Sequence, residues 1–128
     1  MKKLYRLRKN ADFRRARCQG KSWANKLLVL SVVTNDLDCS RFGFSVSRRL
    51  GKAVVRNRTK RLMREAVRGQ KDRVPAGWDL VWIARRPMRE ASFSAVERAV
   101  EQLLRRARLL KAVKESQFKV PDRLPKLS

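Results

Sequence analysis

The stretch from Val54 to Arg68 constrains the fold more than any other part of this 128-residue chain. In an α-helix, which turns about 100° per residue, its apolar and cationic side chains separate onto opposite faces. One face carries Thr59, Leu62, Met63 and Ala66, and the other carries Asn57, Lys60, Arg61, Arg64 and Arg68. The like charges repel one another until an anion binds. The segment therefore predicts a helix that packs on one side and binds an anionic partner on the other.

The overall charge points to a polyanion as that partner. The chain has 34 Lys and Arg against 11 Asp and Glu, a formal net charge of +23 and a pI near 11.7. Self-repulsion at this charge disfavours the compact state unless a polyanion is bound. Arg outnumbers Lys and is clustered, and its planar guanidinium matches phosphate oxygens. Nucleic acid is thus the leading partner, ahead of a merely solvated basic surface.

Several other classes of protein are disfavoured. The first ten residues lack the apolar run of a secretory signal, and no segment has the roughly 18 apolar residues of a membrane span, so we expect a cytoplasmic protein with no membrane partner. Cys18 and Cys39 lack metal-ligand spacing and the chain has no His, so we expect reduced thiols and no metal or cofactor bound by the protein itself. Because the carboxylates are scattered, we expect no catalytic residues.

Periodicity and turn residues predict an α+β domain over residues 1–110, with a small sheet covered by helices on one face. Asn10 is expected to cap a helix over 11–18 that stops at Gly20. Strands are predicted over 27–34, 41–47 and 78–84, and the first two should pair as a hairpin. A helix over 95–110 has Ser94 and Glu97 as a capping box. Residues 111–128 are expected to form a mobile basic tail.

The segment from 41 to 84 reads as strand, helix, strand. This order is typical of a parallel crossover, which is ordinarily right-handed. The large aromatic residues of these strands alternate with other apolar residues, and we assign most of them to the core. They are Phe42, Phe44, Trp78 and Trp82.

A dense set of motifs accompanies these elements. FSVSRR at 44–49 is followed by GKAVVRNRTKRLMRE at 51–65, with LRKN at 7–10, DF at 12–13 and IAR at 83–85. On these residues the chain resembles the protein subunit of bacterial ribonuclease P, from about Leu7 to Leu110. The resemblance implies a single-domain α+β sandwich of the ribosomal-protein-like kind. It also implies that the crossover around the basic helix is left-handed, against the ordinary rule.

The resemblance implies a division of labour in tRNA processing. In that family a catalytic RNA holds Mg²⁺ and cleaves precursor tRNA by hydrolysis, which releases the 5′ leader, while the protein helps to bind the substrate. We therefore expect the non-catalytic, RNA-binding component of an endonuclease that is a ribonucleoprotein. The protein is expected to be monomeric, with one copy per RNA. The absence of His and the scattered carboxylates agree with this expectation.

Two sets of binding residues follow. Those expected on the catalytic RNA are Arg48, Arg49, Lys52, Arg56, Asn57, Arg58, Lys60, Arg61, Arg64 and Arg68. Those expected on the single-stranded leader, in a cleft between the first helix and the sheet, are Phe13, Arg14, Arg17 and Ser31. An aromatic ring stacks on an open base for roughly 1 to 3 kcal/mol. Other family members place aromatics at the positions of Arg17 and Ser31, so stacking should be reduced here.

The sequence leaves several alternatives open. Asn57 either caps a helix or contacts RNA, and Phe13 either stacks on a base or anchors its helix on the sheet. Arg17 either lies flat on a base or pairs with phosphate. The loop over 69–77 resembles a metal site of the family, but with Asp72 alone we expect no dedicated metal. For the whole chain the rivals are a ribosomal protein, a self-sufficient nuclease and a membrane-active basic helix, the last disfavoured by its small apolar surface.

Overall fold

The structure, a computed structural model, describes residues 6, 7 and 9–110. The predicted tail over 111–128 lies outside the described residues. Helices and strands follow in the order α1 (Asn10–Gln19), β1 (Lys21–Ala24), β2 (Leu28–Thr34), β3 (Arg41–Ser45), α2 (Ala53–Arg68), β4 (Trp78–Ala84) and α3 (Phe93–Arg106). Short 3-10 turns follow β3, α2 and β4. The predicted extents of the basic helix and of the last strand are confirmed.

The last strand in the sequence lies inside the sheet. The strand order is β1-β2-β4-β3, with β4 antiparallel to β2 and parallel to β3. The predicted hairpin of β2 with β3 is therefore wrong, because β4 is inserted between them. Leu80, Val81 and Trp82 have no exposed surface, and only an inner strand buries side chains on both faces. β1 was not predicted, because its four residues are mostly exposed and show no apolar alternation.

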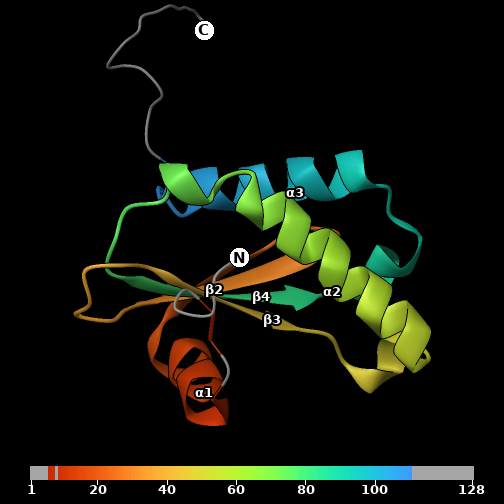
Figure 1. The fold of residues 1–128 in the computed structure, drawn as a ribbon, viewed down its shortest axis with the longest axis horizontal. Coiled ribbons are helices and arrows are strands. Elements are labelled where there is room, and N and C mark those ends of the chain that lie inside the picture. The colour runs from red at the N-terminus through yellow and green to blue at the C-terminus, as the bar shows by residue number, and fades with distance from the viewer. Residues whose placement is uncertain (1–5, 8, 111–128) are drawn as a thin grey trace, which may run out of the picture.

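Helices cover both faces of this sheet (Figure 1). α2 and α3 close the larger core over one face, where Leu30 and Trp82 are fully buried. α1 lies on the other face, where Ala16 packs with Val81 and with the half-buried Phe13. The expectation that helices cover one face holds for α2 and α3 and is wrong for α1. The domain is a small α+β sandwich in which the sheet is the middle layer.

Two helices begin at residues other than those predicted. α1 begins at Asn10 itself, and the cap position is Lys9, whose side chain makes no cap hydrogen bond. α3 is capped by Ser92, whose hydroxyl accepts a hydrogen bond of 3.2 Å from the amide of Ala95. The predicted capping roles of Asn10, Ser94 and Glu97 are therefore wrong. Both serines precede the apolar run, and periodicity alone does not distinguish them.

A buried carboxylate joins α1, β3 and the turn after β2. Asp79 of β4 has no exposed surface, and its Oδ2 accepts hydrogen bonds from Arg15 of α1 at 2.6 Å and from Arg41 of β3 at 2.8 Å. Its Oδ1 accepts from Arg41 Nε and from Asn35 Nδ2, each at 2.9 Å. We call these four residues the Asp79 cluster. The cluster fixes α1 on the sheet.

The Asp79 cluster shifts the pKa values of its members. Burial by itself raises the pKa of Asp79, but hydrogen bonds from Arg41 and Asn35 and the charges of Arg41 and Arg15 outweigh burial and hold this pKa below its ordinary value. The hydrogen bond to Asp79 raises the pKa of Arg41. Asp79 is thus ionised in the folded protein at neutral pH.

We predict that Asp79→Asn lowers the free energy of unfolding by about 3 kcal/mol, near the lower limit for breaking a buried ion pair, because both arginines keep partial access to water. Urea denaturation at neutral pH measures this loss. Asp38→Asn, which removes an exposed carboxylate, is the control and should change little. Equal stability of the two variants would contradict the role of the cluster.

The acid dependence of the free energy of unfolding should differ between the parent chain and Asp79→Asn. Because the pKa of Asp79 is lower in the folded than in the unfolded state, its contribution is complete above the unfolded pKa of about 4 and is lost as the pH falls through the folded pKa. Stability of the parent chain should therefore fall more steeply below about pH 4 than that of Asp79→Asn. Parallel curves of unfolding free energy against pH would contradict this.

Candidate nucleic-acid interface

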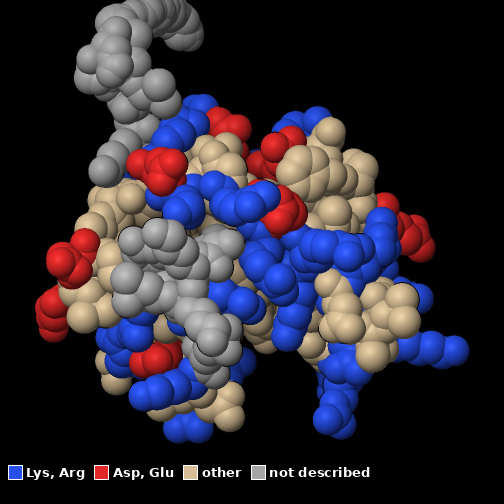
Figure 2. Space-filling model, in the orientation of Figure 1, with Lys and Arg blue, Asp and Glu red and all other residues tan. Residues whose placement is uncertain are grey.

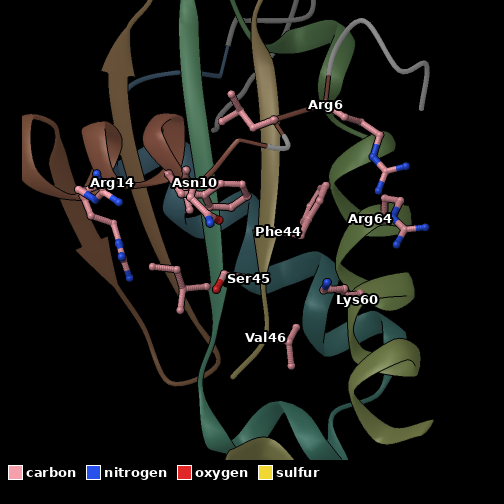
Figure 3. A pocket seen from close by; sticks show the side chains of 13 residues that line it. Arg6, Asn10, Arg14, Phe44, Ser45, Val46, Lys60 and Arg64 are labelled. Carbon is pink, nitrogen blue, oxygen red and sulfur yellow. The ribbon is translucent and has the colours of Figure 1, made fainter. Parts of the chain in front are cut away.

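A groove of about 680 Å³ lies between α1 and α2, over the β3 side of the sheet (Figure 3). Its floor is apolar and includes Phe13, Phe44, Val81 and Ile83. Its walls are cationic, with Arg14 and Arg17 from α1, Lys60 and Arg64 from α2, and Arg6 from the segment before α1. Figure 3 shows Arg14 on the α1 side and Lys60 and Arg64 on the α2 side. Such a groove suits a single strand, because bases seek apolar surface and phosphates seek cations.

Phe13 reaches the floor because Gly43 has no side chain. A Cβ built at Gly43 would lie 2.7 Å from Cζ of Phe13 and 3.0 Å from Cβ of Leu7. The half-buried Phe13 ring also packs against the small core that Ala16 forms with Val81. Phe13 therefore anchors α1 on the sheet and lines the groove at the same time. The two interpretations of Phe13 are compatible, and stacking on a base stays a prediction.

Neighbouring arginines of α1 point to different places. Arg14 and Arg17 are exposed and line the groove, as the leader-binding prediction requires. Arg15, between them, turns to the other side of the helix and bonds to Asp79 and to the carbonyl oxygen of Thr34. The ion pair of Arg15 thus sets the rotation of α1 that presents Arg14 and Arg17 to the groove.

Ser31 does not line the groove. Its side chain is 2% exposed, and its hydroxyl shares a hydrogen bond of 2.7 Å with that of Ser22 on the neighbouring strand. The leader-binding prediction for Ser31 is therefore wrong, because α1 and β1 enclose the side chain. The hydroxyl is satisfied by the exposed Ser22 of β1 instead of a ligand.

α2 divides its polar face between the groove and the outer surface. Lys60 and Arg64 line the groove, although they were predicted to contact the catalytic RNA. The outward residues of the helix are exposed, namely Asn57, Arg58, Arg61 and Arg68. The buried side is formed by Thr59, Met63, Ala66 and Val67. The predicted packing face is confirmed, with Val67 added and Leu62 only half-buried.

Asn57 lies in the second turn of α2, which begins at Ala53 with Lys52 in the cap position. The capping interpretation of Asn57 is therefore wrong. Arg48, Arg49 and Lys52 are exposed in the segment that leads into the helix. Figure 2 shows many Lys and Arg side chains over α2, with residues of other kinds between some of them. We call the exposed set the outer basic surface; its members are Arg48, Arg49, Lys52, Asn57, Arg58, Arg61 and Arg68.

Several groove residues were not predicted from the sequence. Arg6 enters the groove because the segment before α1 runs beside β3, where the Leu7 amide donates to the carbonyl oxygen of Phe42 at 2.8 Å. Phe44 was assigned to the core, but it is half-buried and also faces the groove. Asn10 lines the groove from the first turn of α1. Two local signals existed: the alternation of Phe42 and Phe44, and the spacing that places Asn10 on the helix face of Phe13. The Arg6 contact joins segments that are distant in sequence.

The described Asp and Glu residues lie outside the lining of the groove. Among residues 6, 7 and 9–110, no three His, Cys, Asp or Glu side chains are grouped as metal ligands. Asp72 lies in the short turn Lys71–Arg73, and Glu101 forms an ion pair with Arg105. No helix within the same described ranges has both the length and the hydropathy needed to cross a membrane.

The sheet with helices on both faces and a cationic groove defines a small basic α+β domain. The family model described as Ribonuclease P matches residues 1–108, and the chain belongs to this family. The ribonuclease P protein component of Alkaliphilus oremlandii (strain OhILAs) is 41% identical over 110 residues, which cover 86% of this chain and 96% of that protein. That of Clostridium kluyveri is 44% identical over 110 residues, covering 84% and 98%.

Solved structures agree with the family assignment. The RNase P protein of Staphylococcus aureus superposes with a TM-score of 0.77 at 37% identity, covering 84% of this chain and 98% of that chain. The RNase P protein of Thermotoga maritima gives a TM-score of 0.72 at 37% identity, covering 79% and 96%. The predicted family and fold class are thereby confirmed.

We predict that Gly43→Ala lowers the free energy of unfolding by about 1 to 3 kcal/mol, because the added methyl overpacks the floor against Phe13. Urea denaturation checks this value. In a double-mutant cycle, a Phe13→Leu background should relieve part of the loss. A loss that stays the same in both backgrounds would rule out the contact as its cause.

Proposed function

We propose that this chain is the protein component of the ribonuclease P ribonucleoprotein and that it binds the catalytic RNA and the 5′ leader of precursor tRNA. In this way it assists the endonucleolytic removal of the leader, while the RNA, with the Mg²⁺ it holds, performs the hydrolysis. Membership of the ribonuclease P family supports this choice of reaction. The observation that carries the leader assignment is the groove, with its apolar floor between two cationic walls.

The groove fits a single strand of variable sequence. Phe13 and Phe44 offer ring surface to bases, while Arg14 and Arg17 on one wall and Arg64 on the other are placed for phosphates. Guanidinium groups bind phosphate oxygens in pairs, and stacking on a ring discriminates little between bases. With Arg17 in place of a further ring, binding should depend more on charge and less on stacking. We assign Lys60 and Arg64 to the leader as well.

The outer basic surface is assigned to the catalytic RNA. Arg48, Arg49, Lys52, Asn57, Arg58, Arg61 and Arg68 are exposed there. The half-buried Arg56, whose Nε is buried without a partner among the described residues, lies at its margin. Each phosphate that these cations neutralise releases counterions, so assembly should weaken steeply with salt. Two faces of one helix would thus hold two RNA segments side by side.

A binding role fits the residue types better than a catalytic one. No carboxylate is among the described residues that line the groove, and the chain has no His. Asp79, the fully buried acid, is fully engaged by Arg15, Arg41 and Asn35. The groove therefore offers phosphate and base contacts but no general base of the usual kind.

Reconstitution tests the proposal directly. The purified protein, added to its cognate catalytic RNA at low Mg²⁺, should restore cleavage of precursor tRNA at the mature 5′ end, whereas the protein alone should cleave nothing. Cleavage by the protein alone, or no gain in activity from adding it, would reject the proposed function.

Substitution of two arginines of α2 should distinguish the role of the outer basic surface from that of the groove. Arg61→Ala is predicted to weaken assembly with the catalytic RNA. It should also reduce the slope of the logarithm of the binding constant against the logarithm of the salt concentration by about one unit, which corresponds to one lost phosphate contact. Arg64→Ala should instead weaken binding of precursor tRNA relative to mature tRNA, since Arg64 lines the groove. Binding measured at several salt concentrations checks both, with the exposed Arg98→Ala of α3 as control. Identical profiles for the two variants would contradict the division of α2.

Phe13→Leu should keep an apolar anchor under α1 but remove the stacking surface. Binding of precursor tRNA with a long leader should weaken about 5- to 150-fold, the equivalent of one lost base stack of roughly 1 to 3 kcal/mol. Binding of mature tRNA should be unchanged. An equal loss for both RNAs would show that Phe13 acts only through packing.

A further inference from the structure

A second cavity, of about 480 Å³, lies near the end of α3, toward the β1 edge of the sheet, whereas the groove lies toward the β3 edge. Val32 of β2 forms its floor, and Trp23 of β1 and Trp78 of β4 flank it. The strand register pairs Trp23 with Leu30 and Trp78 with Thr34, so both indoles lie on the same face of the sheet as Val32. The two tryptophans are half-buried, which leaves indole surface open to a ligand.

The cavity is separate from the groove. The groove lies over β3 and β4 and is bounded by α1 and α2, whereas the cavity lies at the edge formed by β1. The groove and the cavity share no lining residue among the described residues. A ligand in the cavity is therefore not the segment that occupies the groove. Its volume falls in the range of about 300 to 1,000 Å³ that is usual for ligand sites.

Cations surround the tryptophans. Lys21 of β1, Arg106 at the end of α3 and Arg108 just beyond it line the cavity. The Arg106 guanidinium is oriented by a hydrogen bond of 2.7 Å to the carbonyl oxygen of Ala24. Open aromatic faces bordered by guanidinium groups are the combination that stacks bases and holds the phosphates between them.

Arg108 has an unusual backbone conformation. Its φ of +60° lies in the left-handed region, where among the described residues Asp36 is the other non-glycine example. The Arg108 amide donates to Arg105, and the Leu109 amide donates to Leu104, which terminates α3 at a position where Gly is the common choice. A side chain held at such a position is strained. Glycine would end the helix here without strain, but this position carries an arginine, whose cation lies at the rim of the cavity.

We propose that this cavity binds a single-stranded RNA segment distinct from the one in the groove, with bases stacked on Trp23 and Trp78 and phosphates on Lys21, Arg106 and Arg108. The chain's own residues 111–128 are a poor occupant, because they carry five Lys or Arg and two acids and would face a cationic rim. We call the proposed site the tryptophan site. It extends the RNA contacts of the domain to the β1 edge of the sheet.

Tryptophan fluorescence reports on this site. Of the three tryptophans, Trp23 and Trp78 line the cavity, Trp82 is fully buried, and none lines the groove. Titration of the full chain with a short oligoadenylate should quench the emission. Trp23→Phe and Trp78→Phe should each reduce the amplitude of quenching, whereas the groove variant Phe13→Leu should retain it. Inorganic polyphosphate, which has charge but no bases, should leave the emission nearly unchanged.

Three outcomes would overturn the proposal. They are no quenching by oligoadenylate, equal quenching by polyphosphate, and quenching that neither Trp→Phe variant reduces. A response that appears only when residues 111–128 are deleted would assign the cavity to that segment instead. Because the readout does not use cleavage or the groove, its failure is distinguishable from failure of the proposed function.

Arg108→Gly supplies a second test with two opposite effects. Glycine relieves the left-handed backbone, so the melting temperature should rise, while loss of the cation should weaken oligoadenylate binding, read by quenching, several-fold. Arg98→Ala removes an exposed charge from α3 away from the cavity and should alter neither value. A rise in melting temperature with unchanged binding would show that Arg108 is only a helix stop and would contradict its role as a phosphate ligand.

Discussion

The ion pairs of Asp79 hold together the parts of this domain that the groove requires. A carboxylate without exposed surface is tolerated only when charges and hydrogen bonds compensate for its lost hydration, and here Arg15, Arg41 and Asn35 supply them. Because Arg15 belongs to α1 and Arg41 to β3, the same interaction fixes the helix on the sheet and sets its rotation. Arg14 and Arg17 reach the groove as a consequence of where Arg15 must point.

The floor of the groove depends on a second constraint, the room for the ring of Phe13. Gly43 leaves that room on β3, and β4 supplies Val81 and Ile83 beside it. The floor is thus part of the small core under α1, while the walls are long cations that stay hydrated until RNA arrives. Packing therefore determines the shape of the groove, and charge determines what it attracts.

The high positive charge of the chain is distributed over surfaces with different geometry. α2 presents Lys60 and Arg64 to the groove and Asn57, Arg58 and Arg61 to the outside. In the proposed function, one helix would separate two RNA segments by its own width. The tryptophan site would add a third contact at the far edge of the sheet. In the proposed function, such a distribution would let a domain of this size contact a large folded RNA on several sides. Counterion release would set the affinity and the few aromatic contacts would set the orientation.

The sequence by itself determined the local features: the packing face of α2 around Met63, the extent of β4 and the family motifs from 44 to 65. These follow from periodicity and residue type, which neighbouring residues define. Only the tertiary structure decided that β4 enters between β2 and β3, that Ser31 is enclosed beside Ser22, and that Arg6 reaches the groove. Each of these depends on which distant segments pair, and a local pattern of side chains specifies that a strand is buried without specifying its neighbour.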